Sequence, residues 1–184
     1  MKIVCAIDIE TTGLDQTAGA RMVEFGAILY DLETERQLGK YIQRINPQKP
    51  IEPKAQAVHG ISFEDVANCP TLEFVAPQII KVMNAASLFV AHNGKGFDIP
   101  FIRGELLRIG TYANEKPLVD TMLDGRWATC SGKFPNLGEL CFATGTLYDT
   151  TQAHGAQYDI EVMMASFFVG YKKGFFKLPE EEYV

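Results

Sequence analysis

The chain has 184 residues, of which 47% are hydrophobic and 22% are charged. This length and composition suit a single soluble domain with one hydrophobic core. A formal net charge of −6 excludes a basic nucleic-acid coat protein, so nucleic-acid binding would require a local groove and metal ions.

The first half of the chain predicts three strands. Residues 2–9 form an apolar, central strand and residues 22–30 a second apolar strand, whereas residues 36–45 alternate as a half-buried edge strand does. A polar turn at 31–35 makes these strands an antiparallel meander. Residues 46–53 contain three prolines and are expected to form an ordered or extended loop.

Strands and helices alternate in the second half. The expected strands cover 87–92 and 118–121, and the expected helices cover 71–83, 99–109, 122–127, 136–145 and 156–171. A meander followed by such alternation predicts an α/β fold with a mixed sheet. We assign residues 1–171 to one domain and 172–184 to a short C-terminal tail, because Pro179 and three glutamates argue against deep burial there.

The cysteines and the apolar segments indicate a cellular setting. The four cysteines show no CxxC spacing, so reduced thiols are expected rather than a zinc site or disulfides. No charged-then-apolar leader is present, and no apolar run approaches the roughly 20 residues that cross a bilayer. A cytoplasmic protein without membrane contact is expected by elimination.

Three short motifs bring four carboxylates and a histidine to the ends of predicted elements. Asp8 and Glu10 end the first strand, Asp98 lies between a strand and a helix, and His154 and Asp159 flank the start of the last helix. Side chains at i and i+2 of a strand share a face, so Asp8 and Glu10 project together. Strand-to-helix junctions place side chains at the open edge of a sheet, where all four carboxylates can meet.

Clustered carboxylates repel each other, and a bound divalent cation offsets that repulsion. Oxygen ligands suit Mg²⁺ or Mn²⁺, and two such ions typically act on a phosphodiester. His154 can accept the proton of the attacking water near neutral pH. Each motif alone has a plainer interpretation: Asp98 can cap its helix, and Asp159 can favour the helix dipole.

These motifs resemble the DEDDh group of DnaQ-like 3′–5′ exonucleases, which includes the proofreading subunit of bacterial replicative polymerases. The resemblance covers about residues 3 to 168, and the matching stretches are 8–14, 45–47, 57–62, 91–93, 97–98, 119–121 and 154–159. The first motif differs from the commonest form only in Ile9. Gly155 and Gln157 replace the commoner arginine-and-leucine pattern of the third motif, which bears on substrate preference near His154.

The resemblance implies a ribonuclease-H-like fold with a five-stranded mixed sheet, composed of the three-strand meander and two parallel strands. It also implies two bound Mg²⁺ or Mn²⁺ ions, held by Asp8, Glu10, Asp98 and Asp159, with His154 as the general base. The residues that it places at the terminal nucleotide are Thr11, Leu14, His59 and Phe97, with Leu14 wedged between bases.

Other conspicuous residues have plainer expected roles. We expect His92 to order the second motif through hydrogen bonds and Glu24 to pair with Arg21 or Lys2. Asp120 and Asp124 are expected to be helix-start or surface carboxylates. The aromatic residues Trp127, Phe134 and Tyr148 are expected at the core or rim. The expected solvated surface cations are Arg103, Arg108 and Lys133.

The expected activity is metal-dependent 3′–5′ hydrolysis of single-stranded or frayed DNA ends, releasing nucleoside 5′-monophosphates. An exoribonuclease or oligoribonuclease with the same chemistry is the alternative enzyme, since no residue here can be assigned to a 2′-hydroxyl. A non-catalytic 3′-end-binding or polymerase-docking module is the alternative of another class. A DNA polymerase is one candidate partner, and residues 174–184 are a candidate docking peptide.

Overall fold

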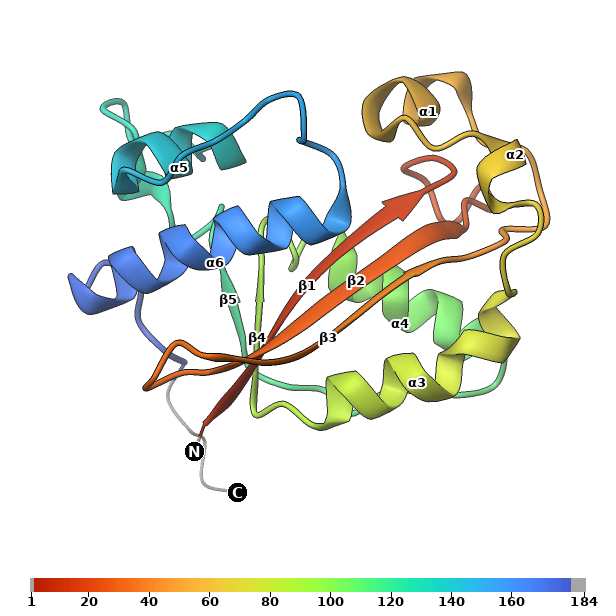
Figure 1. The fold of residues 1–184 in the computed structure, drawn as a ribbon, viewed down its shortest axis with the longest axis horizontal. Helices are drawn as coiled ribbons and strands as arrows, with labels where there is room; N and C mark the ends of the chain where they lie inside the picture. The colour runs from red at the N-terminus through yellow and green to blue at the C-terminus, as the bar shows by residue number, and fades with distance from the viewer. Residues whose placement is uncertain (1, 180–184) are drawn as a thin grey trace.

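A computed structural model describes residues 2–179 and contains one five-stranded sheet (Figure 1). The strands are β1 (Ile3–Thr11), β2 (Met22–Asp31), β3 (Gln37–Arg44), β4 (Leu88–Ala91) and β5 (Leu118–Asp120). Their order is β3-β2-β1-β4-β5; the first three pair antiparallel, and β4 and β5 continue the sheet in parallel from β1. The predicted α/β fold, its meander and its mixed sheet are confirmed. No helix among the described residues is long and apolar enough to cross a membrane.

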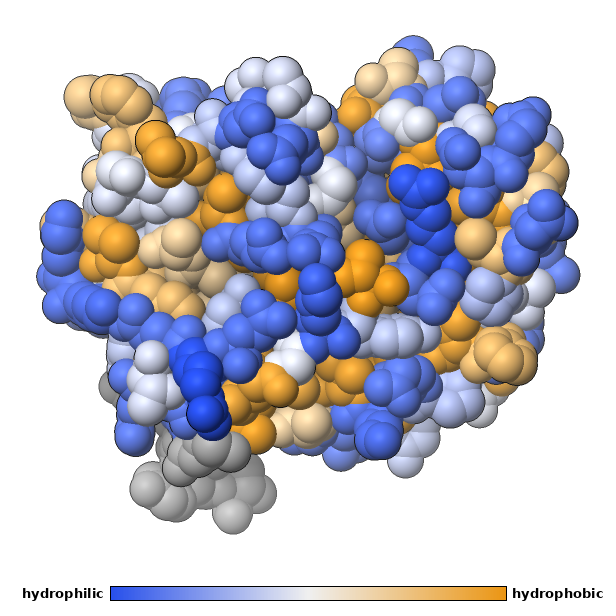
Figure 2. Space-filling view, viewed as in Figure 1, coloured by the Kyte–Doolittle hydropathy of each residue, from blue (hydrophilic) through white to orange (hydrophobic). Residues whose placement is uncertain are grey.

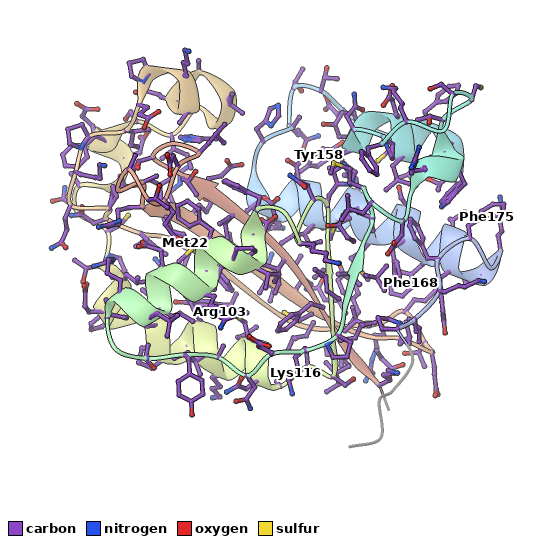
Figure 3. All side chains as sticks on the ribbon, turned by 180° about the vertical axis from the view of Figure 1, so that it is seen from behind. Met22, Arg103, Lys116, Tyr158, Phe168 and Phe175 are labelled. Carbon is purple, nitrogen blue, oxygen red and sulfur yellow. The ribbon has the colours of Figure 1, made fainter. Side chains whose placement is uncertain are left out.

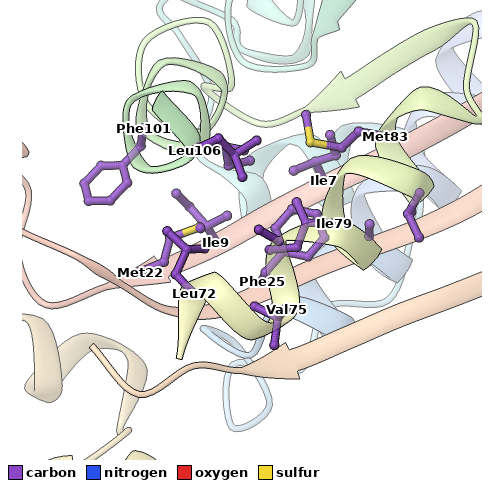
Figure 4. Close-up of a cluster of buried hydrophobic side chains, with 14 of the residues drawn as sticks. Ile7, Ile9, Met22, Phe25, Leu72, Val75, Ile79, Met83, Phe101 and Leu106 are labelled. Atoms are coloured by element: carbon purple, nitrogen blue, oxygen red, sulfur yellow. The ribbon is translucent and has the colours of Figure 1, made fainter. Parts of the chain in front are cut away.

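Helices cover both faces of the sheet. The helices α3 (Leu72–Asn84) and α4 (Asp98–Arg108) lie on one face, and α5 (Leu137–Thr144) and α6 (Ala156–Lys172) lie on the other (Figure 1). Odd-numbered residues of β1, such as Cys5 and Ile7, pack into the core beneath α3 and α4, part of which Figure 4 shows. Even-numbered residues, such as Val4 and Ala6, pack beneath α6. The period-2 alternation of a strand therefore divides the core into two layers.

Two short helices that begin at the end of the proline-rich loop were not predicted. They are α1 (Pro53–His59) and α2 (Phe63–Val66). Val66 of α2 and the flanking residues Ile51 and Ile61 pack against Val23 of β2. Pro53 occupies the first turn of α1, and Gly60 ends that helix in the left-handed conformation at φ 71°. Ser62 and Asp65 form a capping box on α2.

The helix expected at 122–127 is wrong. The chain makes turns there, followed by the single 3-10 turn η1 (Arg126–Ala128). The Asp120 carboxylate accepts hydrogen bonds from the backbone N–H groups of Met122 and Leu123. At Gly125 a Cβ would lie 2.1 Å from the Thr121 carbonyl oxygen, so only glycine fits in this turn.

The expectation of shallow burial after residue 171 fails at Phe176. This side chain is 2% exposed and packs in the core beneath α6, while Phe175 stacks on Trp127 with ring centroids 4.6 Å apart. Figure 3 shows Tyr158 near one end of α6 and Phe168 and Phe175 toward the other. Residues 180–184 lie outside the described residues, so the tail assignment stays a prediction for them.

Candidate active site

Asp8 and Glu10 project from the end of β1 on the face that α6 covers. They continue the even-numbered series of Val4 and Ala6, and across the β1–β2 ladder they lie opposite Gly26 and Glu24. A register shift follows Glu10, and the Thr11 hydroxyl then donates to the Gly13 carbonyl at 2.8 Å. The strand thus ends immediately after its second carboxylate, and both acids lie at the C-terminal end of this central strand.

Asp98 begins α4, and its carboxylate reaches back to β1. Its Oδ1 accepts a hydrogen bond of 3.1 Å from the backbone N–H of Ile9, the residue between the two β1 acids. The loop before Asp98 is held by Asp120, which accepts from the backbone N–H groups of Asn93 and Lys95 at 3.0 and 2.9 Å. Asp120 is 4% exposed, so the surface alternative expected for it is wrong, and its hydrogen bonds from Met122 and Leu123 place it at the start of a turn instead. It organises the second motif from beneath.

His154 and Asp159 are joined by a hydrogen bond across the start of α6. The backbone N–H of His154 donates to Asp159 Oδ2 at 3.0 Å, and His154 has a left-handed backbone at φ 65°. The His154 side chain is exposed. A cavity of about 510 Å³ is lined by Asp8, His92, Tyr148, His154 and Asp159, among others; Glu10 and Asp98 lie outside its lining.

Burial raises the pKa of all four carboxylates, and the charges of neighbouring site acids add to this effect at Asp8 and Glu10. Burial, followed by the charges of the neighbouring acids, raises the pKa of Asp8 well above its usual value. Burial and the charge of Asp159, then of Glu24 and Asp98, raise the pKa of Glu10 to about 8. Burial raises the pKa of Asp98 to about 7, opposed by hydrogen bonds from backbone N–H groups. Burial also raises the pKa of Asp159, opposed by the N–H of His154.

Within residues 2–179, no group of three or more histidine, cysteine or acidic side chains is arranged as a ready metal cage. Asp8 Oδ2 and Asp159 Oδ1 are nevertheless buried without a hydrogen-bond donor in the described part of the chain. Buried carboxylate oxygens ordinarily have a partner, and a divalent cation is one that also relieves the repulsion. A donor set of four carboxylates fits Mg²⁺ or Mn²⁺.

The residues expected to hold the terminal nucleotide lie at the β1 end of the site. The backbone N–H of Ile61 donates to His59 Nδ1 at 3.0 Å, so Nε2 carries the proton and donates to the Thr11 carbonyl at 3.1 Å. Both ring nitrogens are thus engaged. Leu14 is 83% exposed, and Phe97 packs beside Phe101 with ring centroids 5.5 Å apart. Their contacts with a nucleotide stay predictions.

Glu24 and His92 were expected to have structural partners. Glu24 is 8% exposed, and the ion pair seen is with Arg44 at 3.4 Å, whereas Arg21 lies 3.7 Å from Glu105. The predicted pairing of Glu24 with Arg21 is therefore wrong, and the alternative pairing with Lys2 stays a prediction. His92 Nδ1 lies 3.0 Å from the Thr121 hydroxyl, in agreement with the predicted ordering of the second motif.

Trp127, Phe134 and the three basic residues match their plainer expected roles, whereas the half-buried Tyr148 lines the cavity that His154 also lines. Trp127 packs at the end of α6, and Phe134 is 48% exposed beneath the Arg126 guanidinium. The three cations are partly or mostly exposed and are paired with acids: Arg103 with Glu115, Arg108 with Glu73 and Glu105, and Lys133 with Glu139.

The sheet order and the carboxylates at its edge define a nuclease of ribonuclease-H-like fold. A family model described as Exonuclease (RNase_T) matches residues 5–167, and the chain belongs to that exonuclease family. The resemblance to DnaQ-like exonucleases is thereby confirmed.

Several curated proteins are similar to this chain. It is 32% identical over 164 residues to the DNA polymerase III subunit epsilon of Haemophilus influenzae, covering 85% of this chain and 62% of that protein. Identity with the DNA polymerase III PolC-type of Ureaplasma parvum is 36% over 163 residues, covering 88% of this chain and 11% of that protein. The chain thus spans less than two thirds of either relative.

Solved structures share the fold. Exonuclease X in complex with 5′ overhanging duplex DNA aligns with a TM-score of 0.69 and 24% identity, covering 93% of each chain. Exonuclease I of E. coli in complex with a dT13 oligonucleotide aligns with a TM-score of 0.78 and 18% identity, covering 92% of this chain and 41% of that one.

Proposed function

We propose that this chain is a metal-dependent 3′–5′ exonuclease that hydrolyses the terminal phosphodiester of single-stranded or frayed DNA and releases nucleoside 5′-monophosphates. The observation that carries the proposal is the convergence of Asp8, Glu10, Asp98 and Asp159 at the end of β1, where Asp8 Oδ2 and Asp159 Oδ1 are buried without a hydrogen-bond donor among the described residues. Buried acids brought together in this way suit a site that binds cations. Membership of the exonuclease family and the relatives named DNA polymerase III subunit epsilon support the direction and the substrate.

The four carboxylates would hold two Mg²⁺ or Mn²⁺ ions. When bound, such a pair supplies Lewis-acid stabilisation of the charge that develops on the phosphate oxygens. The carboxylates themselves are held in place before metal or substrate binds: the N–H of Ile9 orients Asp98, and the N–H of His154 orients Asp159. Both hydrogen bonds fix ligand carboxylates before any substrate arrives.

His154 takes the proton of the attacking water. Its side chain is exposed and lines the cavity that Asp8 and Asp159 also line. A neutral imidazole has a free ring nitrogen that can accept a proton from water, so it can act as the general base. Gly155 follows it without a side chain, so the segment can adjust to the substrate.

Thr11, Leu14, His59 and Phe97 contact the terminal nucleotide. The exposed Leu14 side chain is suited to wedge against a base, and Phe97, which packs beside Phe101, offers an aromatic surface. Because both His59 nitrogens are engaged with backbone groups, His59 presents its ring face. Apolar and aromatic contacts of this kind tolerate any base, as a general exonuclease requires.

The decisive experiment digests matched single-stranded DNA and RNA oligonucleotides with Mg²⁺ or Mn²⁺, carrying a label at either end. A 3′-labelled DNA should release its label as a mononucleotide at once, whereas a 5′-labelled DNA should shorten stepwise. The Asp8→Asn variant is the control for contaminating nuclease. Faster digestion of RNA would reassign the substrate, and binding of 3′ ends without any release would indicate an end-binding module.

A polymerase partner and a cytoplasmic location are part of the same proposal. The relatives named as polymerase III subunits support the partner, and the four free cysteines suit a reducing compartment. Co-purification of the chain with a replicative polymerase, with and without residues 180–184, tests the association. Loss of binding only in the shortened chain would assign docking to residues 180–184, the last part of the candidate docking peptide 174–184.

A further inference from the structure

A fifth carboxylate, Glu24, lies beside the site and belongs to none of the three motifs. It is on β2, opposite Glu10 in the β1–β2 ladder, and it is 8% exposed. Its charge contributes to raising the pKa of both Glu10 and Asp8. A buried acid that adds to an existing repulsion is unfavourable unless it has another role.

The first turn of α6 reveals such a role. Glu24 Oε2 accepts a hydrogen bond of 3.2 Å from the backbone N–H of Ala156, the first residue of the helix. The N-cap residue, Gly155, has no side chain to accept from the free N–H groups of that turn. Glu24 therefore caps α6 from a neighbouring strand, and its negative charge faces the positive end of the helix dipole.

Gly26 provides a second, independent contact for the same turn. It lies two residues after Glu24 and so on the same face of β2. A Cβ at this position would lie 2.8 Å from Ala156 Cβ and 2.9 Å from Ile160 Cδ1, so α6 packs directly on the bare backbone. Arg44 of β3 lies 3.4 Å from Glu24 Oε1 and balances part of its charge.

We propose that Glu24 is a positioning residue that anchors the start of α6 to β2 and thereby sets His154 and Asp159 against Asp8 and Glu10. His154 and Asp159 flank the anchored residue, two before it and three after it, and are joined by their own hydrogen bond. A displacement of Ala156 therefore moves both together. The kinetic part of this inference rests on the proposed function.

The test compares Glu24→Ala, Glu24→Gln and the control Glu161→Ala, which removes an exposed acid from the same helix. Glu24→Ala should lower kcat about 10- to 100-fold because a misplacement near 1 Å is costly, and KM should change less than about threefold. Glu24→Gln keeps an acceptor for Ala156 and should stay within about threefold of wild type. Glu161→Ala should match wild type.

Amide hydrogen exchange supplies a readout that does not depend on activity. Exchange at residues 156–160 should quicken about tenfold or more in Glu24→Ala alone, with the rest of the chain unchanged. Uniformly faster exchange, or Glu24→Gln as impaired as Glu24→Ala, would overturn the inference. If wild-type protein releases no mononucleotide, the proposed function fails, while the exchange result still decides whether Glu24 anchors the helix.

Discussion

Asp98 is hydrogen-bonded to Ile9: its Oδ1 accepts from the backbone N–H of Ile9 at 3.1 Å. This bond ties the carboxylate at the start of α4 to the β1 residue that separates Asp8 from Glu10. Two segments that are 89 positions apart are thereby fixed at one edge of the sheet. Asp98 can therefore have two roles: a structural one as the acceptor for Ile9, and a chemical one as a proposed metal ligand.

Substitution of Asp98 should distinguish these roles. Asp98→Asn removes the charge but keeps an oxygen that can accept from Ile9, so it should abolish most activity and leave the fold stable. Asp98→Ala also leaves the buried N–H unsatisfied, which costs about 1–3 kcal/mol. Urea unfolding of the metal-free proteins measures the difference. Equal stability of the two variants would show that the hydrogen bond contributes nothing.

The metal-free protein should lose stability as the pH rises from about 4.5 to about 8. The pKa of Glu10 is raised from 4.5 to about 8 in the folded state, so the folded state disfavours its charged form. A group whose pKa is higher in the folded than in the unfolded state adds fully to the free energy of unfolding at pH values below its unfolded pKa. That stabilisation is lost as the pH rises through the folded pKa. Melting temperatures in EDTA across this range test the trend. Glu10→Gln should flatten it, and Mg²⁺ should oppose it.

His154→Ala should lower turnover by about 10²–10⁴-fold, since a general base contributes that much. The four carboxylates are untouched, so Mn²⁺ affinity should stay within about threefold of wild type. Single-turnover rates and metal titrations measure the two quantities separately. Unchanged turnover would remove His154 from the mechanism.

Leu14→Ala should weaken nucleotide handling without affecting the fold. Leu14 is 83% exposed, on a loop that Gln16 ties to α4 through a 2.8 Å hydrogen bond to the Phe101 carbonyl. Its removal should change the free energy of unfolding by less than about 0.5 kcal/mol and raise KM for oligonucleotides. The matched control is Leu147→Ala, since Leu147 is 91% exposed and should alter neither value. A similar KM for both variants would contradict the wedge assignment.

Phe176→Ala should destabilise the protein by about 3–5 kcal/mol, as truncation of a buried aromatic does. Phe176 is 2% exposed in the core beneath α6, whereas Phe175 is 49% exposed. Phe175→Ala should therefore lower the free energy of unfolding by clearly less than Phe176→Ala does. Denaturant midpoints compare the two, and equal losses would mean that the segment after α6 is not anchored through Phe176.

Local patterns were sufficient to predict the main elements of the fold. Apolar strands with period 2, and helices with period 3.6 bounded by Asn136, Gly110 and Gly145, can be recognised from a dozen neighbouring residues. The five strands and the helices α3 to α6 were predicted in this way. The short helices α1 and α2 were not, because four to seven residues carry too little periodicity; their signals were Pro53 before Gly60 and the Ser62–Asp65 capping box.

The sequence by itself was sufficient to propose which groups carry the chemistry, because Asp8, Glu10, Asp98, His154 and Asp159 are adjacent to element boundaries that local rules locate. Only the tertiary structure decided how those groups meet. Asp120 proved buried beneath the second motif, and Glu24 proved to pair with Arg44 and to cap α6. Hydrogen bonds between distant segments depend on packing across the whole sheet, and no window of neighbouring residues contains that information.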